Sequence, residues 1–241
     1  MTKKQDDALY LVKIQLKGAK PPIWRRMAVP RTIILEQFDK IVQETMGWAG
    51  YHLSAFEIDD NGYKQYKKYD EDDDFWDEDC FDYSEYRLCD VLHLGRKSID
   101  YTYDFGDNWE HKITLEDDNY QPPKPLPQPV WCIKGKNACP LEDSGGIWGY
   151  MDLLEVLKNP DDEEYQDAVE WLESLGYESV EEFDPTEFDI DYVNEMLEII
   201  WEKMKNTKKE PKKHKKPVEH SNPEQLQELK ALLKKIIKEG K

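Results

Sequence analysis

The sequence contains little cysteine and no long apolar run. Four cysteines among 241 residues do not make a disulfide scaffold, and a cytoplasmic chain would keep them reduced. No stretch approaches the roughly 18 apolar residues that a membrane-spanning helix needs. Acidic residues interrupt the start MTKKQDDALYLVKIQL, which therefore lacks a secretory signal pattern. We expect a cytoplasmic protein without a membrane segment.

Positive charge is also scarce, because 33 Lys and Arg stand against 52 Asp and Glu, a net charge of −19. The charge is unevenly divided: residues 203–241 hold 13 lysines against 5 acids, whereas residues 1–202 hold 20 basic and 47 acidic residues, a net of −27. Such a body repels DNA, so we do not expect nucleic acid as a partner. The 39% of hydrophobic residues suffices for a sizeable core and excludes general disorder.

Familiar catalytic and cofactor motifs are missing. The chain has no Gly-x-Ser-x-Gly elbow, no His-Glu-x-x-His pair and no dinucleotide fingerprint, so we predict no organic cofactor and leave open whether it is an enzyme. Nine of the thirteen residues 70–82 are acidic, but an EF-hand loop would need glycine at Phe75 and glutamate at Phe81. We interpret this stretch as a flexible acidic loop that could meet the Lys-rich tail.

Hydrophobic periodicity predicts an α+β fold. Alternating patterns indicate strands at residues 9–16, 52–58, 99–105 and 109–115. Helical spacing marks residues 34–46, 147–157, 163–175 and 190–204. Because strands come early and helices late, we predict an antiparallel or mixed sheet with a helical C-terminal part.

The chain divides into three parts. Residues 1–203 form the α+β domain, and residues 204–221 form a disordered linker because they are Lys-dense and nearly free of apolar side chains. Residues 222–241 begin with a capping pattern and predict an amphipathic helix. Its apolar face suggests a protein partner or self-association, through Leu226, Leu229, Leu233 and Ile236.

A hairpin of residues 99–115 carries the clearest register information. Its apolar residues are odd-numbered on both strands, so the strands must pair odd with odd to put them on one face. A three-residue loop, 106–108, meets this condition and places Phe105 opposite Trp109. The loop would end in a left-handed residue, a conformation that Asn108 tolerates well.

The same register predicts a cluster of acids on the other face. Asp104 would lie opposite Glu110, with Asp107 in the turn, and like charges repel. A cation should relieve this repulsion, either a metal ion or one of the side chains of Arg25, Arg26 and Lys112. His111 falls on the apolar face, where we expect a hydrogen-bonded core histidine.

A second acidic motif precedes the helix predicted from residue 147. Glu142 and Asp143 stand ahead of a glycine pair and could cap that helix, placing negative charge at its positive end. If the two acidic motifs met in space, five carboxylates would surround a divalent ion that activates water, which is the constellation of a metal-dependent hydrolase. The residues of that set are Asp104, Asp107, Glu110, Glu142 and Asp143.

Four motifs together resemble one family, the plasmid pRiA4b ORF-3-like family, which also includes passenger proteins of insertion sequences. They are Pro21-Pro22-Ile-Trp24-Arg25-Arg26, Met46-Gly47-Trp48 with His52-Leu53, Tyr103-Asp-Phe-Gly-Asp107 with Trp109 and His111, and Cys139-Pro-Leu-Glu-Asp-Ser-Gly-Gly146. The resemblance runs from about Leu9 to Trp201 and implies an α+β domain of no assigned activity, associated with mobile elements. Members often have a second cysteine where this chain has Ser144, so a thiolate metal site loses one candidate ligand.

Two functions therefore remain open. The first is a protein-binding or adaptor module in which Trp24, Arg25 and Arg26 act as interface anchors, since Trp and Arg dominate interface energetics; Trp24 could equally belong to the core. The second is the divalent-metal-dependent hydrolase built on the carboxylates. A resolvase activity is not supported, because no serine-recombinase nucleophile motif is present.

Overall fold

The computed structural model describes residues 8–59, 63–68 and 79–206. Residues 207–221 of the predicted linker and the helix of residues 222–241 lie outside the described residues, as does most of the acidic stretch 70–82. Residues 204–206, predicted as the start of the linker, instead continue the last described helix. A single mixed sheet of eight strands forms the centre of the described part, in the order β5-β4-β3-β6-β7-β1-β2-β8. Its strands are β1 (Leu9–Leu16), β2 (Trp24–Pro30), β3 (Ser54–Asp59), β4 (Tyr63–Lys67), β5 (Cys80–Asp82), β6 (Ser98–Tyr103), β7 (Trp109–Tyr120) and β8 (Trp131–Lys136).

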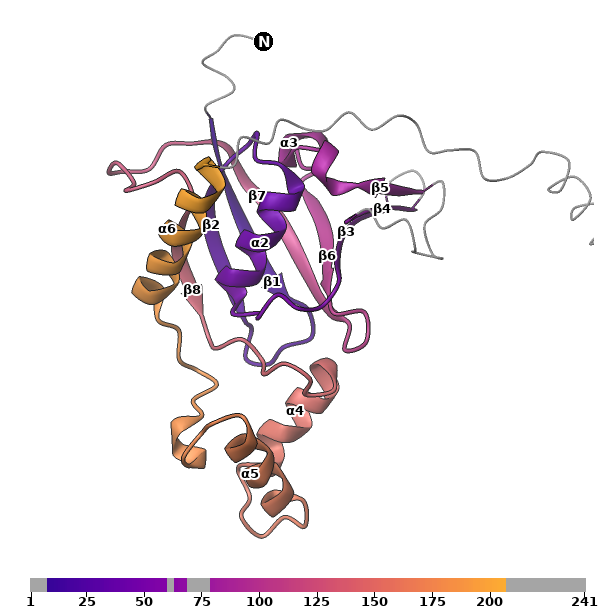
Figure 1. Cartoon of the computed structure of the whole chain (residues 1–241), viewed down its shortest axis with the longest axis vertical. Coiled ribbons are helices and arrows are strands. Elements are labelled where there is room, and N and C mark those ends of the chain that lie inside the picture. Colours follow the sequence, from indigo (N-terminus) through magenta and orange to yellow (C-terminus); the bar gives the residue numbers. More distant parts are fainter. Residues whose placement is uncertain (1–7, 60–62, 69–78, 207–241) are drawn as a thin grey trace, which may run out of the picture.

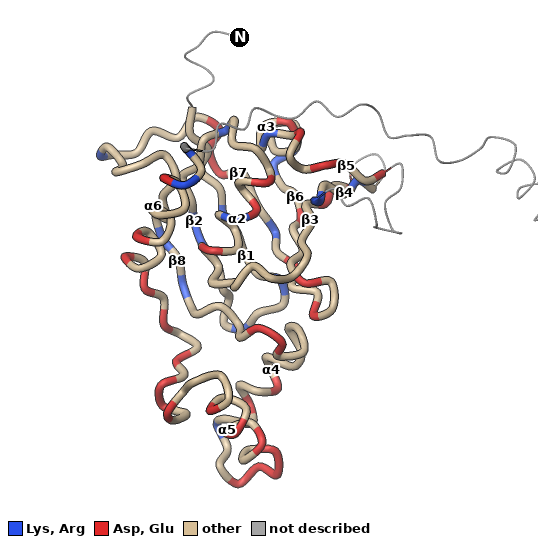
Figure 2. The backbone as a smooth tube through the Cα atoms, viewed as in Figure 1, with Lys and Arg blue, Asp and Glu red and all other residues tan. Residues whose placement is uncertain are grey.

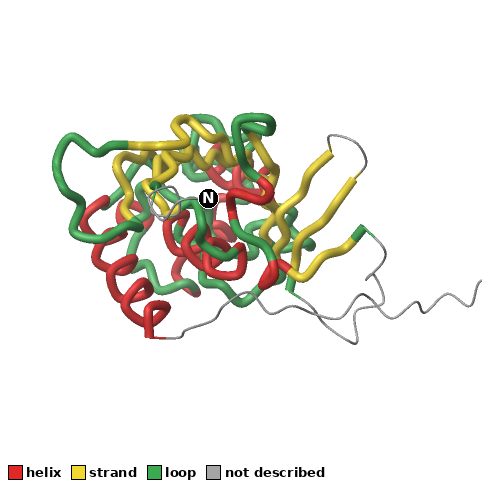
Figure 3. Tube along the Cα trace, turned by 90° about the horizontal axis from the view of Figure 1, so that it is seen from above, coloured by secondary structure: helices red, strands yellow, loops and turns green. Residues whose placement is uncertain are grey.

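Two helices cover one face of the sheet, and two others lie beyond its end. α2 (Leu35–Met46) and α6 (Ile190–Asn206) pack side by side over β1, β2 and β8, whereas α4 (Gly146–Val156) and α5 (Tyr165–Ser174) extend past the strands (Figure 1). Seen from above, the β3–β4 pair projects sideways from the covered part of the sheet (Figure 3). The remaining elements are α3 (Leu88–Val91), η1 (Tyr83–Glu85) and η2 (Val180–Glu182). The predicted α+β fold is confirmed.

The alternating sequence of β1 explains where the core lies. Tyr10, Val12, Ile14 and Leu16 are buried, while the residues between them are partly exposed. α2 places its apolar residues on the face that meets this surface, so strand and helix share one hydrophobic core. No helix in the described ranges has the length and apolar character needed to cross a membrane.

A buried arginine closes the C-terminal end of α2. Arg25 is 1% exposed, and its Nε donates to the carbonyl oxygen of Thr45 at 2.9 Å. Its Nη1 donates to the carbonyl oxygen of Lys136 on β8 at 2.9 Å, and its guanidinium lies 3.9 Å from the ring centre of Phe188. Burial lowers the pKa of Arg25 to about 10. The predicted role of Arg25 as an interface anchor is wrong, because its bonding groups are used inside the domain.

The hairpin pairs odd with odd, as predicted, but two residues out of the predicted register. Tyr103 pairs with Trp109, so the loop spans residues 104–108, and Phe105 is 43% exposed instead of facing Trp109. Asp104 leaves the ladder because its backbone is left-handed, with φ of 56°, and its carbonyl oxygen accepts the N–H of Asn108 at 2.6 Å, which closes the turn. Glu110 consequently lies opposite Thr102, not opposite Asp104. The left-handed conformation of Asn108 is confirmed, with φ of 56°.

Candidate functional site

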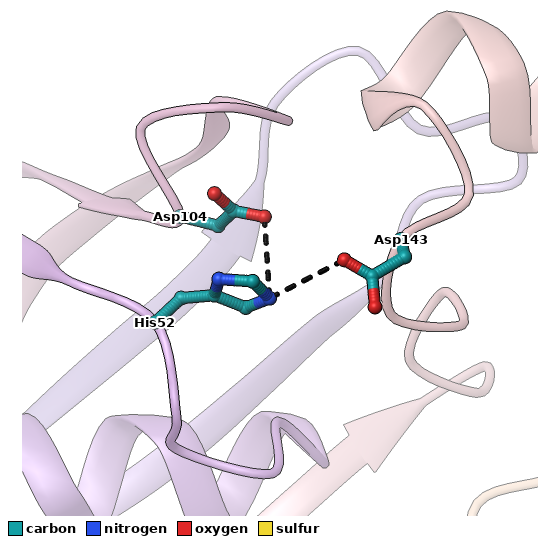
Figure 4. A group of neighbouring side chains, drawn as sticks. All are labelled: His52, Asp104 and Asp143. Atoms are coloured by element: carbon teal, nitrogen blue, oxygen red, sulfur yellow. Dashed lines mark ion pairs between the residues drawn. The ribbon is translucent and has the colours of Figure 1, made fainter.

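Three loops meet at one end of the sheet, between β6 and α4. The first follows α2 and carries His52, the second is the hairpin loop with Asp104, and the third precedes α4 and carries Asp143 (Figure 4). The side chains of these residues converge, although 91 positions separate the first from the last. One potential ligand atom from each lies within 4.8 Å of the other two. No other such group occurs within the described ranges, and no cysteine joins this one.

His52 stands at the centre of the cluster. Its Nε2 lies 3.6 Å from Oδ2 of Asp104, 3.6 Å from Oε2 of Glu142 and 3.4 Å from Oδ1 of Asp143. Both Nε2 of His52 and Oε2 of Glu142 are buried atoms without a hydrogen-bond partner in the described structure. Buried polar atoms nearly always have partners, so this pair calls for a specific explanation.

Backbone and tyrosine donors hold Glu142 in place. Its Oε1 accepts the N–H of Ala49 at 2.7 Å and the hydroxyl of Tyr103 at 3.1 Å. That hydroxyl in turn accepts the N–H of Gly50 at 3.1 Å. Burial first, and then the charge of Glu142, raises the pKa of Tyr103 to about 12, so the phenol stays protonated and continues to donate. One carboxylate oxygen of Glu142 is thereby fixed, and the other faces His52.

The two aspartates of the cluster adopt unusual backbone conformations. Asp104 has φ of 56° and Asp143 has φ of 57°, a left-handed region that non-glycine residues enter at a cost on the order of 1 kcal/mol. Oδ1 of Asp104 accepts the N–H of Gly106 at 2.8 Å, which leaves Oδ2 toward His52. The hydroxyl of Tyr51 donates to Oδ2 of Asp143 at 3.2 Å, which leaves Oδ1 toward His52. Local hydrogen bonds therefore orient both carboxylates.

The residues that we predicted to cap α4, Glu142 and Asp143, do not cap it. Gly145 is the N-cap of α4 and has no side-chain cap, while Glu142 and Asp143 turn toward His52. Asp107 is the acid that contacts the start of α4, because its Oδ2 accepts the N–H of Gly145 at 3.1 Å. Asp107 thus ties the hairpin loop to α4. This bond helps to bring the two acidic motifs together.

The other side chains that we predicted to neutralise or join the acidic cluster lie outside it. Arg26 forms an ion pair with Glu116 at 2.5 Å, and Lys112 lies opposite Asp100 in the β6–β7 ladder. Neither the arginines nor Lys112 therefore neutralises the hairpin acids as we expected. Glu110 is exposed on β7 and is not part of the cluster.

His111 is a core residue, as predicted. It is fully buried, and its Nε2 accepts the indole N–H of Trp48 at 3.3 Å. Burial lowers its pKa to about 4, so the ring is neutral at physiological pH. Trp24 is half-buried on the sheet and flanked by Lys13 and Arg26, each 5.4 Å from its ring centre.

Sequence comparison places the chain in a family. The family profile described as "Plasmid pRiA4b ORF-3-like protein" matches residues 8–192, which include every residue of the cluster. The chain belongs to the plasmid pRiA4b ORF-3-like family. A curated relative is "Uncharacterized protein y4hQ" of Sinorhizobium fredii (strain NBRC 101917 / NGR234), 34% identical over 169 residues, or 70% of this chain and 82% of the relative.

A solved structure supports the same fold for this pRiA4b ORF-3-like chain. The crystal structure of "Protein of Unknown Function MM3350 from Methanosarcina mazei Go1" matches with a TM-score of 0.64 and 34% identity. The match covers 77% of this chain and 97% of the other. The descriptions of these relatives state no activity, so the chemistry of this pRiA4b ORF-3-like protein must be argued from its own side chains.

Proposed function

We propose that the chain binds a divalent cation between His52, Asp104 and Asp143. The observation that supports this proposal is the spacing of 3.4 to 3.6 Å between Nε2 of His52 and the facing carboxylate oxygens. A hydrogen bond would bring these atoms to about 2.7–3.2 Å. Two ligands of one tetrahedral zinc ion, each about 2.1 Å from the metal, stand about 3.4 Å apart. The two distances from His52 are therefore those expected between ligands of a shared ion, and the three ligand atoms all lie within 4.8 Å of one another.

A protonated His52 explains the geometry less well. An imidazolium would offset part of the negative charge, but Nε2 carries one hydrogen, which can point to one oxygen at a time. The oxygens of Asp104, Glu142 and Asp143 that surround it would then compete for a single donor. A cation shared between the side chains interacts with all of them at once.

The ligand types favour zinc or manganese over calcium or magnesium. One imidazole and two carboxylates combine a nitrogen donor with oxygen donors, whereas calcium and magnesium sites consist of oxygen ligands alone. Three protein ligands leave a coordination position for water, as in catalytic zinc sites. Such a metal lowers the pKa of its bound water to near neutrality.

Glu142 is suited to act as the general base. Its Oε2 is unpaired and faces the cluster, while its Oε1 is anchored by Ala49 and Tyr103. An ion held by His52, Asp104 and Asp143 would supply an acidified water, and Oε2 would be placed to accept a proton from it as the water oxygen bonds to an electrophilic carbon of the substrate. Glu142 would return that proton to the leaving group as the bond between the carbon and the leaving group breaks. This assignment gives the chain the constellation of a metal-dependent hydrolase.

Metal binding can be tested by melting curves of the full chain after chelator treatment, with Zn²⁺ or Mn²⁺ added back. We expect the melting temperature to rise, because an ion bound by the folded state stabilises it by about 2.7 kcal/mol at a hundred times its Kd. Asp104→Asn should abolish the rise while keeping the hydrogen bond to Gly106. Glu110→Gln, on the same hairpin and outside the cluster, should keep the full response. An equal response in wild type and Asp104→Asn would exclude this site.

The protein-binding module stays a prediction. Its helix, with Leu226, Leu229, Leu233 and Ile236, lies outside the described residues. Deletion of residues 205–241 should abolish partner capture or self-association if that prediction is right, whereas the metal response should survive the deletion. The cytoplasmic location and the association with mobile elements are likewise predictions.

A further inference from the structure

We infer that the substrate of this site is a polypeptide segment with apolar and basic side chains, not a phosphate ester. This inference rests on the proposed metal site. The first argument is charge. Three acids face His52 at the centre, namely Asp104, Glu142 and Asp143, and a divalent ion offsets two of their three formal negative charges. Within the described ranges, their recorded ion pairs are all with His52. An anionic substrate would be repelled, whereas a neutral or cationic one would not.

The second argument is the apolar rim, by which we mean Tyr51, Leu53, Phe105 and Trp148. These side chains are 61%, 65%, 43% and 82% exposed, respectively. Each belongs to one of the segments that supply the cluster: Tyr51 and Leu53 flank His52, Phe105 follows Asp104, and Trp148 stands at the start of α4. Exposed Trp and Tyr side chains are typical anchors of polypeptide ligands.

The third argument is a hollow of about 210 Å³ beside Asp107, between the end of β1 and the start of α4. Its wall includes Lys17, Glu110, Trp109 and Trp148. Among these residues, Lys17 offers an ammonium donor, Glu110 a carboxylate acceptor and Trp148 an aromatic face. Peptide groups offer the complementary carbonyl oxygen and N–H.

The shape of the site also favours a chain over a compact molecule. Small-molecule sites are enclosed clefts of about 300–1,000 Å³ that bury most of their ligand. Here the hollow is smaller, and the apolar rim is distributed over the three segments that supply the cluster, including the start of α4. An extended segment can contact the rim, the ion and the hollow together, with basic side chains near the acids.

The test uses the full chain loaded with Zn²⁺ and fluorescence anisotropy with a labelled, capped peptide Gly-Lys-Leu-Phe-Lys-Gly. We expect binding that weakens when Leu and Phe are replaced by Ser in the peptide, and more when Lys is replaced by Glu. Leu53→Ala and Trp148→Ala should each weaken binding about tenfold. Phenyl phosphate should not displace the peptide.

Matched controls come from exposed apolar residues away from the site. Leu94 is 63% exposed and Tyr192 is 58% exposed, so Leu94→Ala and Tyr192→Ala should leave binding within twofold. Equal losses in these controls, displacement by phenyl phosphate, or no binding of any of the three peptides would overturn the inference. Melting curves on the same samples separate the two proposals: a metal response without peptide binding rejects the polypeptide alone, and no metal response rejects the metal site itself.

Discussion

At the scale of single residues, adjacent arginines on β2 have opposite environments. Arg25 is buried and donates to main-chain carbonyls of α2 and β8, whereas Arg26 forms a surface ion pair with Glu116. We expect Arg25→Met to lower the free energy of unfolding by about 3 kcal/mol or more, because it leaves buried acceptors without donors. Arg26→Met should cost less than about 1 kcal/mol, as surface pairs do. Urea unfolding measures both, and equal costs would contradict this account.

His111 makes stability depend on pH in a defined window. Its pKa is about 4 in the folded chain and near 6.5 when exposed, so between these values the unfolded chain binds a proton that the folded chain does not. Stability should therefore fall as pH drops from 6.5 to 4, by on the order of 3 kcal/mol from this residue. His111→Gln keeps an acceptor for Trp48 and should remove that part of the slope. Identical slopes in urea titrations of the two proteins would contradict the prediction.

The residues of the cluster show what sequence reasoning could and could not reach. The two acidic motifs were recognisable as candidate ligands, since carboxylates near turns are visible in the sequence, and the structure brings three of those five acids together around His52, while Asp107 bonds to the start of α4. His52 was not predicted as a site residue, because the sequence pattern assigned it to a strand of residues 52–58 and its partners are distant in sequence. In the structure β3 begins at Ser54, and His52 lies in the loop before it. Its place next to the Trp48 motif was the one available signal.

At the scale of elements, the junction of the hairpin loop with α4 positions the acids. Gly146 has φ of 69°, and a Cβ there would lie 2.3 Å from the carbonyl oxygen of Asp107. We expect Gly146→Ala to cost about 3 kcal/mol and to weaken the metal response, because α4 must move away from the loop. Gly176 has φ of 98° and open space around it, so Gly176→Ala should cost about 1 kcal/mol from backbone strain alone.

Melting curves of the Gly146→Ala and Gly176→Ala variants with and without Zn²⁺ would separate displacement of α4 from general destabilisation. If Gly176→Ala weakened the metal response as much as Gly146→Ala, general destabilisation and not the junction would be responsible.

Periodic elements were predictable and irregular ones were not. β1, α2 and the three later helices match their predicted ranges closely, because each carries a regular pattern of apolar residues. β2 and β8 were missed, since paired arginines interrupt one and a glycine with two lysines interrupts the other. β4 and β5 were missed because β4 is short and polar and β5 has only three residues, and β5, Cys80–Asp82, replaces the end of the predicted acidic loop. The odd-with-odd pairing of the hairpin was predicted correctly, because side chains alternate between the two faces of a strand. The register was wrong because Asp104 turns left-handed and its carbonyl oxygen accepts the N–H of Asn108, which makes the loop five residues long instead of three.

At the scale of the whole molecule, acidic residues are concentrated in the C-terminal part of the described structure. Residues 159–202 contain 17 acidic residues and no lysine or arginine, and Figure 2 shows them along α5 and on the segment that leads to α6. Like charges at this density destabilise the compact state, and salt screens them. We expect the melting temperature to rise by several degrees between 20 and 500 mM NaCl, at about 2–4 °C per kcal/mol. Sucrose at equal osmolality is the control, and an equal rise in sucrose would reject electrostatic repulsion as the cause.

The bonding of Arg25 has a consequence for how this domain varies among its relatives. Its guanidinium contacts carbonyl oxygens of Thr45 and Lys136, atoms that every amino acid carries. The side chains at those two positions can change without altering the bonds, so neither position has to vary together with Arg25. Methods that infer contacts from pairs of co-varying positions would therefore miss these bonds between β2, α2 and β8. Phe188, whose ring lies 3.9 Å from the guanidinium, is the neighbour whose side chain could co-vary with Arg25.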